Sequence, residues 1–330
     1  MEFDKSFGNN TIGWSLVVLS QNHILLSISS IGVFLHFLLW FQLFYHKIRF
    51  DFSFIFPLCY ISTDIFLIIG YFVQYGIRTT AKTTTSQVSC YFEAFFGIYF
   101  NILETCYLAA ISVCRYYQIV RNENVYIRHS YGILFICIII PCIIMINMIV
   151  QYEMSWCIVI EQPGSSCSLA FNSISVRIWN LTVIFALPIM ISLITSIRCI
   201  TYLKHAYSQQ ILTRRNHHHQ LICRFCTFYA IWLILWAPYV LLIHLDIETI
   251  GNQINFLASL GNTIETTIDG IMLSVLDKRL AMAWGKTFNI VLRRLNWNQR
   301  NKVNPLHQLT LPVNNKTYLK NNNTHAIKSV

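Results

Sequence analysis

The chain has 330 residues, of which 55% are hydrophobic and only 12% are charged. Soluble domains carry about a quarter charged residues, so this composition excludes an ordinary water-soluble enzyme or binding domain and indicates a membrane protein. The formal net charge of +10 would suit nucleic acid. The basic residues, however, lie in short segments beside apolar stretches, where anionic membrane lipid is the nearer partner. We therefore expect membrane lipid and no nucleic acid as a partner.

Seven apolar stretches are each long enough to form a membrane-spanning helix, which needs about 20 residues. They cover residues 22–46, 54–77, 87–119, 130–152, 173–203, 219–246 and 254–277. Twenty of the 24 lysine and arginine residues fall on one side of these stretches, and the other side holds Lys5, Arg78, Lys82 and Arg177. Because cytoplasmic loops carry the excess of basic residues, this asymmetry places the N-terminus outside. The expected fold class is an all-α membrane protein, a seven-transmembrane helix bundle.

The segments on either side of this seven-transmembrane domain, residues 22–277, differ in composition. Residues 1–21 are the expected extracellular N-terminus, where Asn9 lies in an acceptor sequence for glycosylation. Residues 278–296 mix apolar side chains with basic ones, which predicts a short amphipathic eighth helix on the inner leaflet. Residues 297–330 are polar and asparagine-rich without apolar periodicity, so a disordered cytoplasmic tail is expected.

Three of the 11 cysteines lie on the predicted outer side: Cys90 at the start of the third span, and Cys157 and Cys167 between the fourth and fifth. The segment with the last two alternates apolar residues around the turn QPGSS, which predicts a short β-hairpin. In an oxidising exterior, a disulfide from Cys90 would hold this hairpin over the mouth of the bundle. We favour the pair Cys90–Cys167, with Cys157 as the alternative partner.

Five of the predicted spans carry short motifs. These are CYISTDIFLI in the second span, AISVCRYYQIV at the end of the third, IFALPIMIS in the fifth, ILWAPYVLL in the sixth and DGIMLSVLDKRL in the seventh. Together they resemble, in a divergent form, the landmarks of the rhodopsin-like (class A) G-protein-coupled receptors over residues 22–296. The residues that carry the resemblance are Asp64, Arg115, Tyr116, Pro188, Trp236, Pro238 and Asp269.

The resemblance implies a plasma-membrane receptor for an extracellular ligand, either a peptide or a small chemosensory molecule. Binding would shift the sixth helix and open a cytoplasmic cleft in which Arg115 and Tyr116 meet a heterotrimeric G protein. The implied activation switch comprises Pro188, Trp236, Pro238 and Asp269. In the family an acid beside the arginine restrains it at rest, and Cys114 replaces that acid here, so we expect some signalling without ligand. Ser196 and Leu273 replace two tyrosines that hold the arginine on activation, which opposes this effect.

Four acidic residues lie within predicted spans, and by the resemblance they fall on positions of the family's central sodium pocket: Asp64, Glu104, Glu265 and Asp269. Four ionised carboxylates at close range in a low dielectric would repel strongly, so protons or a bound cation must neutralise some of them. A sodium ion is the candidate ligand, and proton sharing is the alternative. A hydrogen-bonded core network without a regulatory role is the third interpretation. We expect no other cofactor and no other metal.

The ligand site is less constrained by the sequence. The resemblance places Gly97 where amine receptors carry an aspartate and Thr263 where opsins carry the retinal-binding lysine, so a biogenic amine and retinal both lack their usual partner. The residues expected to form a mixed pocket below the hairpin are Gln74, Tyr75, Gly97, Asn101, Asn180, Tyr239, Ile243 and Ser259. The outer face is expected to be mainly acidic, which favours a basic peptide or a small cationic odorant. Its charged residues are Glu93, Glu161, Asp246 and Glu248, with Arg78. A merely solvated acidic rim is the alternative.

Two other classes of function remain open at this stage. A transporter or ion channel could use the buried carboxylates as an ion pathway, although neither inverted repeats nor paired broken helices are visible. A chemosensory or scavenging receptor could bind its ligand without a G protein. The histidines and cysteines form no catalytic constellation, so we expect no enzyme activity.

Overall fold

The structure, a computed structural model, describes residues 15–46, 52–80, 87–121, 123, 125–161, 166–205, 212–245, 252–276 and 278–303. Its long helices are α1 (Leu16–Tyr45), α2 (Ile55–Thr80), α3 (Gln87–Val120), α5 (Ser130–Glu153), α7 (Leu187–His205), α8 (Leu212–Leu245) and α9 (Asn252–Leu276). A short 3-10 turn, η1 (Phe52–Phe54), precedes α2, and the four-residue α4 (Val125–Arg128) precedes α5. The fifth span is composite: α6 (Ile174–Asn180) continues through a π-helical turn, η2 (Leu181–Ala186), into α7.

Six of the described helical spans are long and apolar enough to cross a membrane. α9 is the seventh helix of the bundle, and it carries two acids, Glu265 and Asp269. Both of these acids are buried, as expected for ionisable side chains that face the interior of a membrane bundle. The chain is therefore a multi-pass membrane protein with the predicted seven-helix bundle.

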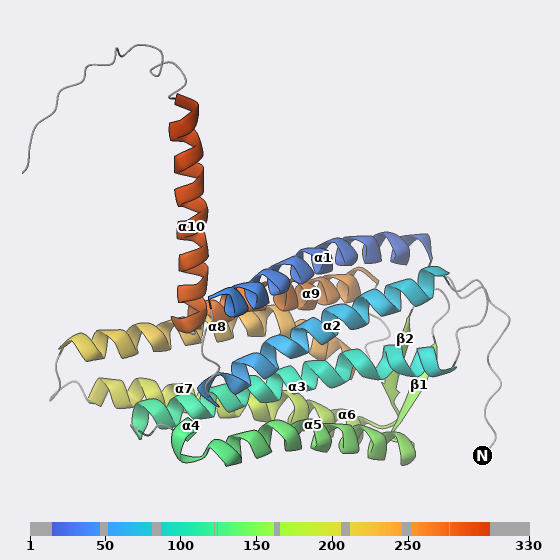
Figure 1. Ribbon diagram of the computed structural model, residues 1–330. Coiled ribbons are helices and arrows are strands. Elements are labelled where there is room, and N and C mark those ends of the chain that lie inside the picture. Colours follow the sequence, from blue (N-terminus) through green and yellow to red (C-terminus); the bar gives the residue numbers. More distant parts are fainter. Residues whose placement is uncertain are drawn as a thin grey trace, which may run out of the picture. The chain divides into compact units, whose positions relative to one another are not determined.

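α3 has a central place in this bundle. It packs against α2, α5 and α7, while α9 packs between α1 and α8 (Figure 1). Large side chains of α2, α3, α8 and α9 meet in one apolar core, and those among them that are at most 1% exposed include Tyr60, Leu108, Trp232, Trp236 and Leu273. Lipid supplies no hydrophobic force between helices, so close packing and interhelical hydrogen bonds hold such a bundle together.

α9 approaches α8 closely at Gly261. A Cβ atom added there would lie 2.7 Å from the backbone oxygen of Leu235, so any larger side chain would push the two helices apart. Small residues allow this close backbone approach in membrane bundles, where it gains van der Waals contact. The approach also fixes the position of Glu265 and Asp269, which lie on the same helix.

The predicted hairpin is present as β1 (Cys157–Glu161) and β2 (Cys167–Phe171), an antiparallel pair with Cys157 opposite Phe171. A disulfide joins Cys90, near the start of α3, to Cys167, which confirms the favoured pairing. Cys157 is a free, buried thiol, so the alternative partner is not used. Figure 1 shows the hairpin at the end of the bundle where α2 ends and α3 begins.

We expect Cys157 to react slowly with maleimide in the folded protein. Burial raises the pKa of its thiol, so less of the reactive thiolate is present at neutral pH, and labelling should accelerate as the pH rises. The measurement is peptide mass spectrometry of timed labelling, with Cys157→Ser to verify the assignment and unfolded protein as the reference. Labelling as fast in the folded as in the unfolded protein would contradict the buried position of β1.

The helix boundaries differ most from the predicted ones at three places. α1 begins at Leu16, six residues before the predicted start and within the predicted extracellular N-terminus. α8 begins at Leu212, so the polar residues before the sixth predicted span are already helical. α10 (Lys278–Val303) contains the predicted eighth helix and continues past residue 296, because loss of apolar periodicity removes a buried face without preventing a helix. The rest of the predicted tail, 304–330, lies outside the described residues, as does Asn9. The chain forms two compact units, Met1–Trp284 and Gly285–Val330, and the bundle belongs to the first.

Candidate functional site

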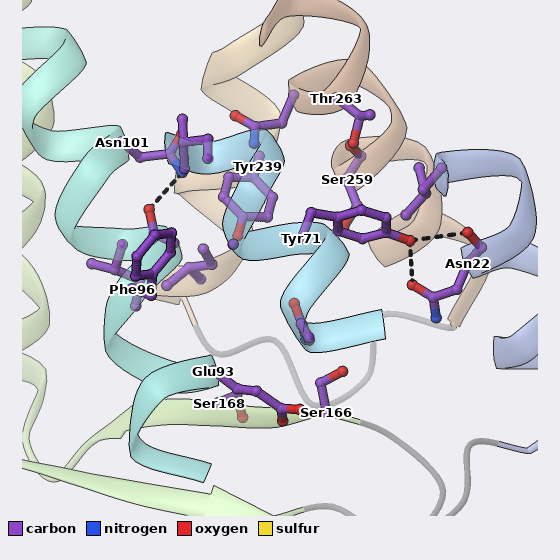
Figure 2. A pocket seen from close by; sticks show the side chains of 18 of the residues that line it. Asn22, Tyr71, Glu93, Phe96, Asn101, Ser166, Ser168, Tyr239, Ser259 and Thr263 are labelled. Atoms are coloured by element: carbon purple, nitrogen blue, oxygen red, sulfur yellow. Dashed lines mark hydrogen bonds between the residues drawn. The ribbon is translucent and has the colours of Figure 1, made fainter. Parts of the chain in front are cut away.

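A cavity of about 560 Å³ lies beneath β2, between α1, α2, α3, α8 and α9. This volume falls within the range of about 300–1,000 Å³ that is typical of sites for drug-sized ligands. Figure 2 shows its lining, with Asn101 of α3 and Asn22 of α1 on either side of Tyr71 and Tyr239 in this view. Glu93 lies nearer the hairpin.

The structure brings most of the predicted pocket residues together. Those that line the cavity are Gln74, Gly97, Asn101, Tyr239, Ile243 and Ser259. Tyr75 lies apart from this lining, with its ring 5.8 Å from that of His23 between centroids. Asn180 is buried elsewhere and exchanges two hydrogen bonds, of 2.8 and 2.9 Å, with the side-chain amide of Gln151. Asn180 therefore joins the fourth and fifth spans instead of lining the cavity.

One face of α1 also lines the cavity, although the sequence analysis did not single it out. Asn22, Leu25 and Ser29 lie three and four residues apart, which places them on one side of the helix. Asn22 accepts a hydrogen bond of 2.8 Å from the Tyr71 hydroxyl of α2. Polar residues at this spacing in an apolar span are the signal that could have identified the face.

The acid nearest the hairpin is not available to a cationic ligand. Arg78 of α2 donates to both carboxylate oxygens of Glu93 of α3, at 2.8 Å to Oε1 and 2.5 Å to Oε2. The backbone N–H of Cys167 donates to the same carboxylate at 3.0 Å. Both charged side chains are at most 1% exposed. The prediction of an exposed acid is therefore wrong for Glu93, because an arginine of the neighbouring helix neutralises its carboxylate.

The other three acids of the expected outer rim are not among the described side chains. The side chain of Glu161 and the whole of Asp246 and Glu248 lie outside the described residues. Thr263, at the position of the retinal-binding lysine, lines the cavity and donates its hydroxyl to the backbone oxygen of Ser259 at 2.8 Å. A threonine offers no amine, so the cavity has no group for a Schiff base at that position.

An aromatic stack leads from the cavity to the middle of the bundle. Trp236 donates its indole N–H to the side-chain oxygen of Asn101 at 3.0 Å, and its ring stacks on that of Trp232 with centroids 4.5 Å apart. Trp232 donates to Glu104 at 2.8 Å. Phe185 of η2 also stacks on Trp236, at 5.6 Å between centroids. Two tryptophans of α8 thus connect a cavity residue to a buried acid.

The four predicted acids meet in the middle of the bundle, where each is at most 2% exposed. Asp64, Glu104 and Asp269 each contribute one oxygen atom to a group whose members lie within 4.8 Å of one another. Glu265 lies within hydrogen-bond reach of Glu104 and Asp269. Neither carboxylate oxygen of Asp64 has a hydrogen-bond partner among the described residues. Close approach and missing partners together mean that the cluster is incomplete without a proton or a cation.

Tyr60 links two of these carboxyl groups. Its hydroxyl contacts Asp269 and lies 3.2 Å from Glu104. A phenol has only one proton to donate, so the second contact needs a proton on a carboxyl group. The oxygen atoms of the cluster, with both oxygens of Asp64 unpaired among the described residues, also suit a small hard cation such as sodium. The donor set therefore fits both predicted neutralising agents.

Arg115 lies near the end of α3, at the opposite end of the bundle from the hairpin. It donates to the backbone oxygen of Leu276, the last residue of α9, at 3.3 Å. Its guanidinium group also lies over the ring of Phe225 of α8, 5.4 Å from the centroid, within the range of a cation–π contact. α8 and α9 thus restrain an arginine that the neighbouring Cys114 could not hold by charge.

The other residues predicted for coupling and activation lie along the same helices. Tyr116 follows Arg115 and makes an edge-on ring contact with its neighbour Tyr117. Pro238 lies inside α8, two residues after Trp236. Pro188 lies at the start of α7, immediately after the π-helical turn. Asp269, the last of them, belongs to the acid cluster.

Comparison with known proteins identifies the fold. No protein-family model matches the chain, and no curated protein matches it significantly in sequence. Among solved structures, the crystal structure of squid rhodopsin matches with a TM-score of 0.64, at 15% identity, over 84% of this chain and 86% of the rhodopsin chain. The chain therefore has the rhodopsin-like seven-helix fold, as its five motifs predicted.

Proposed function

We propose that this chain is a ligand-activated receptor that couples to a heterotrimeric G protein. The observation that carries the proposal is the unbroken set of contacts from Asn101 in the cavity, through Trp236 and Trp232, to Glu104 among the buried acids. α8, which carries both tryptophans, also holds Arg115 at the other end, together with α9. A change in the cavity can therefore bias contacts at the coupling end.

In this mechanism a ligand competes for the side chain of Asn101 and so alters its hydrogen bond with Trp236. Pro238 has no backbone N–H, and the missing hydrogen bond makes that part of α8 the natural place to bend. Movement of the far end of α8 would take the ring of Phe225 away from Arg115. The arginine could then enter a cleft and bind the G protein.

We place the receptor in the plasma membrane with the hairpin outside the cell. The excess of basic residues on the opposite side supports this orientation. The disulfide between Cys90 and Cys167 supports it too, since such bonds persist in oxidising surroundings.

We further propose that the acid cluster holds a sodium ion or shares protons. Asp64, Glu104, Glu265 and Asp269 would supply the oxygen atoms. A bound cation supplies the positive charge that ionised carboxylates need in a buried site. Because Trp232 and Tyr60 donate to the same acids, neutralisation of the cluster and the position of α8 depend on each other.

Replacement of Arg115 by alanine is expected to lower basal nucleotide exchange on the coupled G protein. A hydrogen bond to a charged group contributes about 1.5–3 kcal/mol, so the loss should be about tenfold to a hundredfold. The measurement is uptake of a labelled GTP analogue by purified heterotrimers mixed with purified chain in lipid. The matched control is Arg128→Ala, which removes an exposed arginine whose ion pair with Glu123 lies on the surface.

Two results would contradict this proposal. The first is absence of exchange by the unmodified chain on every class of heterotrimer, when the protein is folded in lipid. The second is equal loss of exchange in the Arg115 and Arg128 variants, which would mean that surface charge and not the cleft decides coupling. Ion flux through liposomes containing the purified chain would support the channel alternative.

A further inference from the structure

The cavity lining carries almost no net charge. Among the lining residues that the structure describes, Glu93 is the one acidic or basic side chain. Arg78 pairs with its carboxylate, and the Cys167 backbone N–H donates a hydrogen bond to it. Its burial also keeps water away from the pair. A charged ligand would have to give up its hydration in this cavity without gaining an opposite charge, which is costly.

Hydrogen-bonding groups without charge are plentiful instead. Six side-chain amides line the cavity: Gln21, Asn22, Gln74, Asn101, Asn255 and Asn262. The Oδ1 atom of Asn262 is buried and has no partner among the described residues. The hydroxyl of Tyr239 has no hydrogen-bond partner in the described part of the chain either, and it also lines the cavity. A ligand with its own neutral donor and acceptor groups would satisfy these atoms.

The lining also has an apolar part. It includes Leu25, Leu67, Phe92, Phe96, Leu242 and Phe256. An apolar skeleton would bury its surface against these side chains and gain about 25 cal/mol for each Å² removed from water. A cavity of about 560 Å³ suits a whole small molecule of this kind, whereas a folded peptide could insert only one or two side chains.

Gly97 shows how the cavity is kept open at its centre. A Cβ atom built on Gly97 would meet only the hydroxyl oxygen of Tyr239, at 4.0 Å. The glycine therefore faces open space, and a larger residue there would project into the cavity without a clash. Gly97 stands where amine receptors carry an aspartate. The cavity has room for a side chain at this position, but glycine supplies none that could bind a cation.

We propose that this cavity takes an uncharged small molecule, an apolar carbon skeleton that bears one or two hydroxyl or carboxamide groups. The proposal names the ligand class of the receptor site argued above and rests on that function. It replaces the expectation of a basic peptide or a cationic odorant, because Glu93, the one acid among the described lining residues, is paired within the protein. Recognition then depends on amide side chains and on Tyr239.

The experiment uses the purified full-length chain in lipid nanodiscs and sets of probes that share a skeleton and differ in head group. One set is 2-phenylethanol, phenylacetamide, 2-phenylethylamine and phenylacetate, and cyclohexyl and linear alkyl skeletons give matching sets. Thermal unfolding is followed over a range of concentrations of each probe. For each skeleton that stabilises the protein, we expect the alcohol or the amide to act at a concentration at least about tenfold lower than the amine or the acid.

Introducing a negative charge at position 97 tests whether the preference for neutral probes can be reversed. Gly97→Asp should reverse the preference towards the amine by about tenfold or more, since its carboxylate would supply the missing opposite charge. Gly97→Ala is the matched control and should keep the preference of the unmodified chain. Gly97→Leu, which projects a larger apolar side chain into the cavity, should weaken stabilisation by every probe while the protein still unfolds cooperatively.

Three results would overturn the proposal. These are a preference of the unmodified chain for amines or acids, stabilisation by no neutral probe of any skeleton, and undiminished binding by the Gly97→Leu variant. The readout needs no G protein. A chain that prefers neutral probes but exchanges no nucleotide would therefore refute the proposed coupling alone, and a coupling chain that prefers amines would refute the ligand class alone.

Discussion

Replacing Arg78 with methionine is expected to destabilise the folded chain by about 3–5 kcal/mol, because removal of one partner leaves the other charge buried and unpaired. The orphaned group is the carboxylate of Glu93, which is 0% exposed and receives three hydrogen bonds from Arg78, two from Nε and one from a terminal nitrogen. The backbone N–H of Cys167 would remain as a single donor. The measurement is the free energy of unfolding in mixed micelles of denaturing and mild detergent.

The double variant Arg78→Met and Glu93→Leu separates the ion pair from packing. Replacement of a buried pair by apolar residues of similar volume is often neutral or stabilising, so the double variant should recover most of the lost stability. The matched control is Arg128→Met, whose partner Glu123 shares an exposed ion pair and whose effect should be small. A single Arg78 variant as stable as the unmodified chain would show that Glu93 is solvated in solution.

The sequence predicted the bundle well because the bilayer leaves few choices. A spanning helix must satisfy its own backbone, which sets its length, and the basic residues mark its ends. α9 shows why the order of motifs is needed in addition to hydropathy to identify a span. Glu265 and Asp269 make this helix less apolar, and yet both are buried within the bundle. The hairpin was predictable from short apolar segments on either side of a turn, and the disulfide from the small number of cysteines outside the spans.

The ligand site was predicted only in part, for a different reason. Residues of α3 and α8 were found because the resemblance assigns them positions in the bundle. Asn22 and Ser29 were missed, although their spacing marks one side of α1, because other polar residues such as Gln21, His23 and Ser27 weaken the periodicity of this helix. The charge of the site was predicted wrongly at Glu93, because its pairing with Arg78 joins two helices and depends on their packing.

The four acids of the central cluster were identified from the sequence, but the side chains that donate hydrogen bonds to them were not. That Asp64, Glu104 and Asp269 gather within a few ångströms follows from the resemblance. That Trp232 and Tyr60 donate into the same group does not, since it requires the rotamers of Trp232 on α8, a further helix, and of Tyr60 on α2. Such contacts determine which helix responds when the cluster changes its charge.

Sodium is expected to stabilise the unmodified chain against unfolding and to leave the Asp64→Asn variant unaffected. Asp64 is 0% exposed and neither of its oxygens has a partner in the described part of the chain, so it has the most to gain from a bound cation. A ligand present at a hundred times its dissociation constant adds about 2.7 kcal/mol to the stability of the folded state. The measurement is the unfolding temperature in sodium against choline salts of equal ionic strength, at constant pH.

Two further variants assign the response to the cluster. Asp269→Asn should also abolish the sodium effect, because Asp269 contributes an oxygen to the same group. Glu123→Gln changes the charge by the same amount at a surface ion pair and should preserve the effect. If the sodium response is absent but stability varies with pH in the unmodified chain and not in the Asp64 variant, the cluster shares protons instead of holding a cation. If all of these chains respond alike to sodium and to pH, the four acids are a structural network and the regulatory role is refuted.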